Sequence, residues 1–226
     1  MSNSRESINM EELVTRLGRL DSCAVSDALD KLGLTGAVSG IHRLSTDRRI
    51  SGPVLTVKLD KDDGRTAAAR HLGTGAIEAS QRGDVIVVEQ RTGIDAAGWG
   101  GTLSLGASLR GVAGVIIEGP ARDVDEGRLH DFPVFARGHT SRTARGRLVE
   151  VGTNVTIMVG DVSVSPGDYV VGDGSGVVFV TSAEIDKVLD TAEAIAAREK
   201  GMADALRAGT PIGQVMGKSY ETMLKR

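Results

Sequence analysis

The chain has 226 residues, of which 40% are hydrophobic and 30 are glycine, and its net charge is −3. That length and apolar content allow one domain with a substantial core. The slightly acidic balance and only six aromatic residues argue against a nucleic-acid surface, which needs basic patches and stacking rings. The apolar runs are too short to span a bilayer, and the single cysteine, Cys23, excludes an internal disulfide. We therefore expect a cytoplasmic protein that binds neither nucleic acid nor membrane.

Two helices are predicted near the amino terminus. Leucines recur at helical spacing over residues 10–20, after acidic residues suited to a first turn. Residues 25–32 are expected to form a second, shorter helix that ends at Gly33, with Ser26 or Asp27 near its start and Asp27 acting as a cap rather than in catalysis. Both helices have an apolar face that must pack on a core.

Strands and helices alternate through the middle of the chain. The strands are expected at 53–59, 85–90 and 114–118, where apolar residues alternate or run together. The helices are expected over the alanine-rich stretch 66–80, with breaks at Gly73 and Gly75, and over 102–110. This alternation is typical of an α/β fold.

The carboxyl-terminal third predicts a β meander and then one long helix. Short apolar strands are expected at about 147–159, 162–164, 169–171 and 177–181, separated by Pro-Gly and Gly-rich turns. The helix over 182–207 carries a continuous apolar stripe. It must cover the sheet or a neighbouring subunit.

The stretch 98–123, GWGGTLSLGASLRGVAGVIIEGPARD, carries the clearest chemical signal. Its glycine-rich turn precedes a helix, and backbone N–H groups at a helix start favour an anion such as a carboxylate. Arg122 and Asp123 follow the strand at 114–118 together. A guanidinium binds carboxylates with two parallel hydrogen bonds, and a carboxylate is a ligand for magnesium or manganese. The stretch therefore predicts a pocket for a small acid and a metal, although turn glycines and a solvated Arg-Asp turn would give the same pattern.

Five segments together resemble the RraA-like family, which includes regulators of ribonuclease E activity and 4-hydroxy-4-methyl-2-oxoglutarate aldolases. They lie at 25–33 (VSDALDKLG), 83–89 (GDVIVVE), 98–126, 132–138 (FPVFARG) and 164–180. The resemblance spans nearly the whole chain, and the block at 98–126 is the most specific part.

The resemblance implies a single domain over residues 1–226, with a layered α/β fold of stacked β-sheets and flanking helices, of the swivelling β/β/α type. Amino-terminal helices at about 10–33 and a carboxyl-terminal helical segment at about 183–207 would pack on the core or on a neighbouring subunit. The family further implies a homotrimer or a dimer of trimers with active sites between subunits.

The same resemblance implies a role for each residue of the pocket. Asp123 would anchor Mg²⁺ or Mn²⁺, and Arg122 would contact the keto-acid end of the substrate. The carboxylate of pyruvate would be received by the backbone at Gly98, Gly100, Gly101, Thr102 and Leu103. The implied activity is that of a metal-dependent lyase that forms pyruvate from a small 2-oxo acid, by retro-aldol cleavage of a 4-hydroxy-2-oxo acid or by oxaloacetate-type decarboxylation.

One position departs from the family pattern. The family aldolases have an aspartate twenty-one residues before the arginine, where it helps to hold a water that acts as acid or base, and here that position is Gly101. Candidate substitutes are Asp95, His71 and Glu199, the last reaching over from a neighbour's closing helix. Decarboxylation needs no base to start, so it should tolerate the glycine better than aldol cleavage does.

The missing carboxylate leaves a second function open. The chain could be a non-catalytic, oligomeric RraA-like protein that binds and regulates a ribonuclease. The presence of Arg122, Asp123 and the glycine turn favours the lyase.

Overall fold

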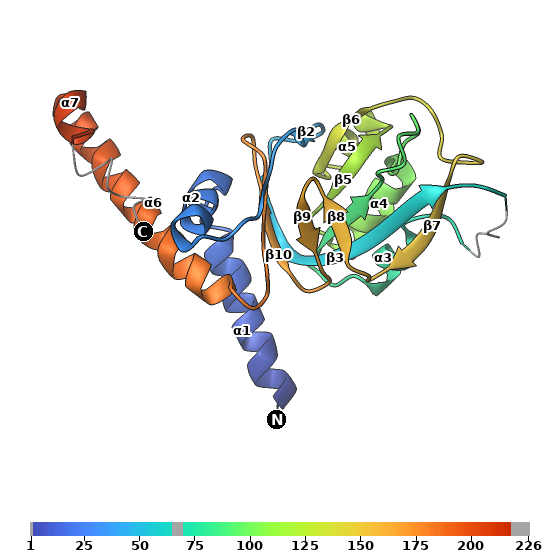
Figure 1. Cartoon of the computed structure of the whole chain (residues 1–226), viewed down its shortest axis with the longest axis horizontal. Helices are drawn as coiled ribbons and strands as arrows, with labels where there is room; N and C mark the ends of the chain where they lie inside the picture. Colours follow the sequence, from blue (N-terminus) through green and yellow to red (C-terminus); the bar gives the residue numbers. More distant parts are fainter. Residues whose placement is uncertain (1, 65–69, 218–226) are drawn as a thin grey trace.

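The computed structural model describes residues 2–64 and 70–217. Its main feature is a curled nine-stranded sheet (Figure 1). The strands follow one another across the sheet in the order β1 (Ala37–Val38), β11 (Val177–Val180), β10 (Tyr169–Gly172), β3 (Ile50–Lys61), β4 (Val85–Glu89), β5 (Gly114–Ala121), β6 (Val134–His139) and β2 (His42–Arg43), with β7 (Leu148–Thr153) also paired to β3. A separate hairpin is formed by β8 (Ile157–Val159) and β9 (Val162–Val164).

The centre of the sheet is parallel. β3 pairs in parallel with β4, β4 with β5, and β5 with β6, whereas the outer pairings are antiparallel. The carboxyl ends of the four central strands therefore meet at one edge of the sheet.

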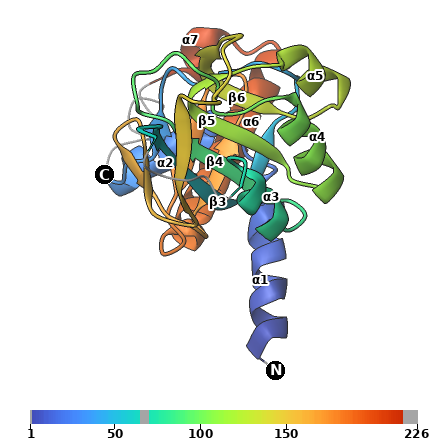
Figure 2. The ribbon, with the colours of Figure 1, turned by 90° about the vertical axis from the view of Figure 1, so that its right-hand side faces the viewer.

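Two groups of helices flank the sheet. They are α1 (Ser2–Leu17), α2 (Ser22–Leu32), α3 (Thr74–Ala79), α4 (Gly101–Arg110), α5 (Val124–Leu129), α6 (Ile185–Arg207) and α7 (Ile212–Val215). Figure 1 shows α1, α2 and α6 gathered beyond β10, with α7 at the far end of α6. Figure 2 shows α3, α4 and α5 beside one another along β4 and β5. No helix within the described residues is long and apolar enough to cross a membrane.

The alternation of side chains along β4 explains the layers. Ile86 and Val88 point to one face of the sheet and pack in a cluster with residues of α3 and α4. Val85 and Val87 point to the opposite face, where the β8–β9 hairpin and strands β10 and β11 cover them. Because both faces are buried, the strand is apolar from Val85 to Val88 rather than alternating with polar residues. The stacked sheets and flanking helices expected from the sequence are present.

The amino- and carboxyl-terminal helices form a third cluster on the outer face of β10 and β11. α1 is also held to α6 by Arg16, whose guanidinium lies 2.6 Å from Asp190 and 2.8 Å from Glu193. The hydrogen bond from Arg16 lowers the pKa of the Glu193 carboxyl. Helices from the two ends of the chain thus form one unit.

Two local expectations were wrong. Asp21 caps α2, because its side chain accepts a hydrogen bond from the Ala24 N–H at 2.8 Å, and Asp27 lies inside the helix. The break expected at Gly73 in the helix over 66–80 is present, because Gly73 has a left-handed conformation with φ 78° and α3 begins at Thr74, but the second break expected at Gly75 is absent, since Gly75 lies inside α3. Residues 65–69 of that expected helix lie outside the described residues.

Asp173 ties the β10–β11 turn to the start of α2. Its carboxylate accepts hydrogen bonds from the Ser22 N–H at 2.8 Å, the Ser22 hydroxyl at 2.7 Å and the Ser175 N–H at 2.9 Å. Burial acts to raise the pKa of Asp173, but these hydrogen bonds outweigh it and the pKa lies below its ordinary value. The charged form therefore stabilises the fold above the ordinary carboxyl pKa of about 4, and this contribution is lost as the pH falls.

We expect Asp173→Asn to lower the free energy of unfolding by about 1–3 kcal/mol at pH 7, because buried N–H and O–H donors lose a charged acceptor. The difference from the wild type should shrink as the pH falls below about 4, because the carboxyl then takes up a proton more readily in the unfolded chain than in the folded protein. Urea denaturation at pH 7 and pH 3.5 measures both effects. Asp47→Asn, at a fully exposed side chain, serves as the control. An equal loss at both pH values would contradict the assignment.

Candidate active site

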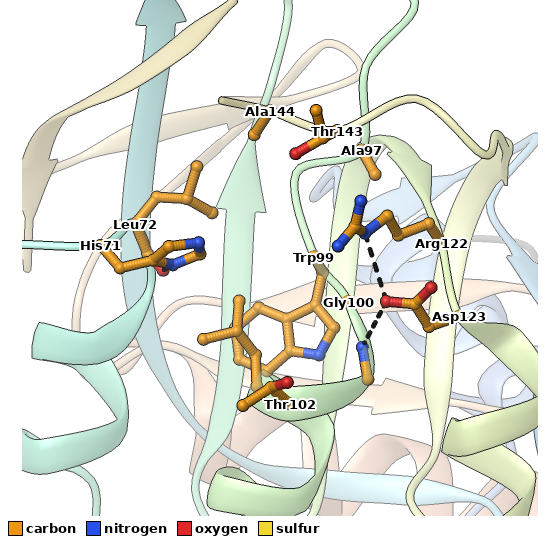
Figure 3. Close-up of a pocket in the computed structure, with 12 residues that line it drawn as sticks. His71, Leu72, Ala97, Trp99, Gly100, Thr102, Arg122, Asp123, Thr143 and Ala144 are labelled. Atoms are coloured by element: carbon orange, nitrogen blue, oxygen red, sulfur yellow. Dashed lines mark hydrogen bonds and ion pairs between the residues drawn. The ribbon is translucent and has the colours of Figure 1, made fainter. Parts of the chain in front are cut away.

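One small pocket, of about 90 Å³, lies at the edge where the four parallel strands end (Figure 3). Each central strand contributes to it through the segment that follows. The lining comes from His71 and Leu72 between β3 and α3, from Ala97 and Trp99–Leu103 after β4, from Arg122 and Asp123 after β5, and from Thr143 and Ala144 after β6. Ligand sites in open parallel sheets lie at this edge.

The start of α4 forms the floor of the pocket. Gly100 is extended and its carbonyl accepts the first helical hydrogen bond, from the Ser104 N–H at 3.0 Å. The Ser104 hydroxyl accepts a hydrogen bond from the Trp99 indole at 3.0 Å, which fixes the turn against the buried ring. The N–H groups of Thr102 and Leu103 lie in the first turn, where a helix leaves donors without an internal acceptor. Such donors, with the helix dipole, suit a carboxylate.

Asp123 links the two walls of the pocket. Its Oδ2 accepts a hydrogen bond from the Gly101 N–H at 3.1 Å and lies 3.2 Å from Nε of Arg122. The backbone of Asp123 is left-handed, with φ 56° and ψ 40°, a conformation that few residues other than glycine adopt. Strain of this kind persists where surrounding contacts enforce it, and it is frequent at functional sites.

The aspartate also suits a divalent cation. The hydrogen bond and ion pair of Asp123 within the described part of the chain both use Oδ2, so Oδ1 remains available as a ligand. Residues 2–64 and 70–217 contain no cluster of three or more potential metal-ligating side chains. Magnesium commonly binds through one or two carboxylates and completes its shell with substrate oxygens and water. Asp123 fits that kind of site, and manganese has similar oxygen ligands.

Gly98 does not line the pocket, contrary to expectation. Its N–H donates to the Pro120 carbonyl at 2.9 Å and is not available to a ligand. A Cβ at this position would lie 2.9 Å from Oε1 of the buried Gln90. The amide of Gln90 in turn donates to the carbonyls of Ile94 and Ala96, while its Oε1 has no partner among the described residues. Gly98 therefore provides close packing, and the backbone predicted to bind the carboxylate is reduced to Gly100–Leu103, where the Gly101 N–H already donates to Asp123.

The three candidate substitutes for the missing carboxylate lie in different places. His71 lines the pocket. Asp95 lies outside the lining, with Oδ2 at 3.4 Å from Nε of Arg142. Glu199 lies on α6, where burial and then the nearby Asp21 carboxylate raise its pKa. Within one chain, only His71 reaches the pocket.

A fourth candidate, the carboxylate of Glu126, lies beside Gly101 and was missed in the sequence analysis. A Cβ on Gly101 would lie 1.7 Å from Oε2 of Glu126 and 2.9 Å from its Cβ. The side chain of Glu126 thus fills the space that a side chain at position 101 would need. Glu126 lies in the first turn of α5, three residues after Asp123. Its place beside Gly101 depends on how α4 and α5 pack, so the sequence alone carries no signal for it.

We expect Gly98→Ala to destabilise the protein by about 1–3 kcal/mol, because the added methyl would press on Gln90 Oε1 and on Leu59 at 3.3 Å. Gly106→Ala is the matched control. Gly106 lies within the helix α4, and a Cβ at this position would meet only Ile77, at 4.0 Å. Alanine should therefore stabilise by about 0.5–1 kcal/mol there. Chemical denaturation measures the change in the free energy of unfolding for each variant. A change in the same direction for both would contradict the role of Gly98.

Comparison with known proteins shows matches over most of the chain. A family model described as RraA-like, Aldolase/RraA, matches residues 22–179. DlpA of Legionella pneumophila is 28% identical over 212 residues, and the match covers 94% of this chain but 34% of DlpA, so the chain spans about a third of that relative. A Halalkalibacterium halodurans protein named "Putative 4-hydroxy-4-methyl-2-oxoglutarate aldolase" is 30% identical over 202 residues, covering 87% of this chain and 91% of that protein.

Solved structures share the fold. An uncharacterised protein from Pseudomonas syringae pv. tomato superposes with a TM-score of 0.81 at 28% identity, covering 92% of this chain and 98% of its own. RraAS2 of Streptomyces coelicolor, described as an unusual member of the RNase ES inhibitor RraA protein family, superposes with a TM-score of 0.75 at 28% identity, covering 84% and 94%. The curled sheet with flanking helices is therefore the architecture of RraA-like structures.

Proposed function

Because this chain belongs to the RraA-like Aldolase/RraA family, we propose that it is a divalent-metal-dependent lyase that cleaves a carbon–carbon bond of a small 2-oxo acid and releases pyruvate. One observation carries the proposal. The start of α4, the Arg122 guanidinium and the Asp123 carboxylate line one small pocket, as recognition of a 2-oxo acid beside a cation requires.

The pocket would orient the substrate by its carboxylate. The N–H groups of Thr102 and Leu103 would donate to one end of that group, and Arg122 would add charge and a second contact. Arg122 is itself held beside Asp123. This places the 2-oxo group next to the free oxygen of Asp123.

A divalent cation bound at Asp123 would stabilise the negative charge that develops on the 2-oxo oxygen as the carbon–carbon bond breaks. Glu126 supplies the carboxylate that position 101 lacks. Its side chain would accept the proton of the substrate C4 hydroxyl, so that the C4–O bond becomes a carbonyl while C3 keeps the electron pair of the broken bond. Aldol cleavage therefore depends on Glu126.

Decarboxylation makes a smaller demand on the protein. In an oxaloacetate-like acid the bond between C3 and the distal carboxylate breaks without prior removal of a proton, and carbon dioxide leaves. The N–H groups of Thr102 and Leu103, which would bind the substrate carboxylate, and Asp123 suffice for that reaction. The two reactions can thus be separated by variants of Glu126.

We extend the proposal to the assembly, a homotrimer or a dimer of trimers with active sites between subunits. RraA-like proteins are typically oligomeric. Two large apolar side chains support an interface: Leu109 and Leu129, at the ends of α4 and α5, are 79% and 78% exposed, and the two helix ends are adjacent, with the Ser108 hydroxyl 3.5 Å from the His130 carbonyl oxygen. Exposed apolar side chains that gather on one face commonly mark contact surfaces.

Regulation of a ribonuclease by binding is the second candidate, favoured by the description of RraAS2 as a member of an RNase inhibitor family. Its main support from the sequence was the absence of a carboxylate at position 101. Glu126 in that space weakens this support. Ribonuclease capture by the purified protein, without turnover of any 2-oxo acid, would favour the regulator.

The first test is release of pyruvate from oxaloacetate and from 4-hydroxy-2-oxo acids, followed through lactate dehydrogenase with Mg²⁺, with Mn²⁺ and with chelator. We expect metal-dependent release that falls at least about 100-fold in Asp123→Ala, because the cation loses its anchor. Asp95→Asn, on the rim, should retain the wild-type rate. Wild-type protein that leaves every substrate at the background rate would exclude the lyase.

The second test concerns the carboxylate beside Gly101. We expect Glu126→Gln to slow aldol cleavage by about 100-fold or more, the usual contribution of a general base, and to leave decarboxylation within about threefold. Steady-state kinetics on the two substrate types measures this split. Equal losses in both reactions would contradict the role of Glu126.

A double variant tests whether positions 101 and 126 are interchangeable. Gly101→Asp alone should impair the site, because its Cβ would overlap the Glu126 side chain. Combined with Glu126→Gly, it should restore aldol cleavage relative to Glu126→Gly alone. A double-mutant cycle on cleavage rates measures this coupling, and additive effects would show that the two positions act independently.

A further inference from the structure

His71 lies on the wall of the pocket that faces Arg122 and Asp123. It belongs to the segment between β3 and α3, and Figure 3 shows its ring reaching into the pocket from the side opposite the Arg122 guanidinium. The carboxylates of Asp123 and Glu126 lie on the α4–α5 side. A ligand held by Arg122 and the start of α4 would therefore have His71 on its far side.

The hydrogen bond of the His71 ring determines which nitrogen is free. Nδ1 lies 3.0 Å from the carbonyl oxygen of Leu72. A carbonyl can only accept, so this contact is a hydrogen bond when Nδ1 carries the proton. In the neutral ring Nε2 then has the lone pair, and this arrangement fixes both tautomer and ring orientation. Leu72 is buried, so the carbonyl is held in place by its own packing.

From this geometry we infer that His71 is the catalytic acid and base at C3 of the substrate, a role distinct from that of Glu126 at the C4 hydroxyl. This inference rests on the proposed lyase function. After the carbon–carbon bond breaks, Nε2–H of the protonated ring gives its proton to C3. The electron pair of the C2–C3 double bond forms the new C–H bond, the 2-oxo group is restored, and pyruvate leaves with the ring neutral.

The reverse transfer makes the step measurable on pyruvate alone. Neutral Nε2 removes a methyl proton from bound pyruvate, and the electron pair moves into the C2–C3 bond and onto the 2-oxo oxygen. The imidazolium exchanges its proton with solvent and returns a deuteron when the solvent is D₂O. Imidazole suits this cycle because it gains and loses a proton near neutral pH.

The experiment is proton NMR of pyruvate in D₂O with the full-length protein and Mg²⁺, compared with oxaloacetate decarboxylation by the same samples. We expect the wild type to exchange the methyl protons and His71→Gln to do so at least about 100-fold more slowly. Loss of oxaloacetate in a single turnover should be slowed far less than exchange in His71→Gln, because the carbon–carbon bond breaks before the proton transfer to C3. Glu126→Gln should show the opposite pattern on hydroxy-oxo acids, losing aldol cleavage but keeping exchange.

Controls separate catalysis from folding. The affinity for oxalate, measured by calorimetry, and the midpoint of thermal unfolding should be unchanged in His71→Gln. Asp95→Asn should exchange the pyruvate methyl protons at the wild-type rate. Two results would overturn the inference but not the proposed function. The first is exchange of the pyruvate methyl protons by His71→Gln at the wild-type rate. The second is a wild-type protein that decarboxylates oxaloacetate but does not exchange the methyl protons. Wild type with neither reaction would overturn the proposed function as well. Loss of both reactions together with weakened oxalate binding would assign His71 to substrate binding and overturn the inference.

Discussion

Hydrogen bonding between four parallel strands places every segment of the pocket at one edge of the sheet. β3, β4, β5 and β6 run in the same direction in adjacent positions, so the segment that follows each strand starts at the same level. Pocket residues separated by more than seventy positions in the chain become neighbours for this reason. Close packing on both faces of β4, which is buried at every position, makes this arrangement rigid. The chemistry proposed for the pocket requires that rigidity.

Asp123 converts this arrangement into a preorganised site. Its left-handed backbone turns the chain directly from β5 into α5, and its side chain crosses to the start of α4. The hydrogen bond to Gly101 offsets part of the backbone strain and fixes one carboxylate oxygen, while the other stays free. A group held in this way needs no rearrangement when charge develops on a ligand, which is the main source of electrostatic stabilisation in enzymes.

The sequence predicted the centre of this structure well because the information there is local. The strands after Gly83 and Gly111 are continuous apolar runs, and Arg122 and Asp123 are adjacent in the chain. The two-residue strands β1 and β2 have no periodicity to detect. The late start of α3 depends on the left-handed Gly73, whose N–H contacts Glu150 from another part of the sheet. Glu126 required knowledge of how α4 and α5 pack, which spacing alone does not supply. That the domain comprises the whole chain stays a prediction.

Because the Glu126 side chain fills the space beside Gly101, the residue type at position 101 is a poor guide to classifying such chains. A rule that assigns or denies activity by the residue type in one alignment column would class this chain with inactive members of its family. In the structure, the side chain of Glu126, on a different helix, occupies the space that a side chain at position 101 would need. With the role proposed for Glu126, the pocket requires one carboxylate, which either of the two chain positions can supply. Family members should therefore be sorted by the pair of positions together.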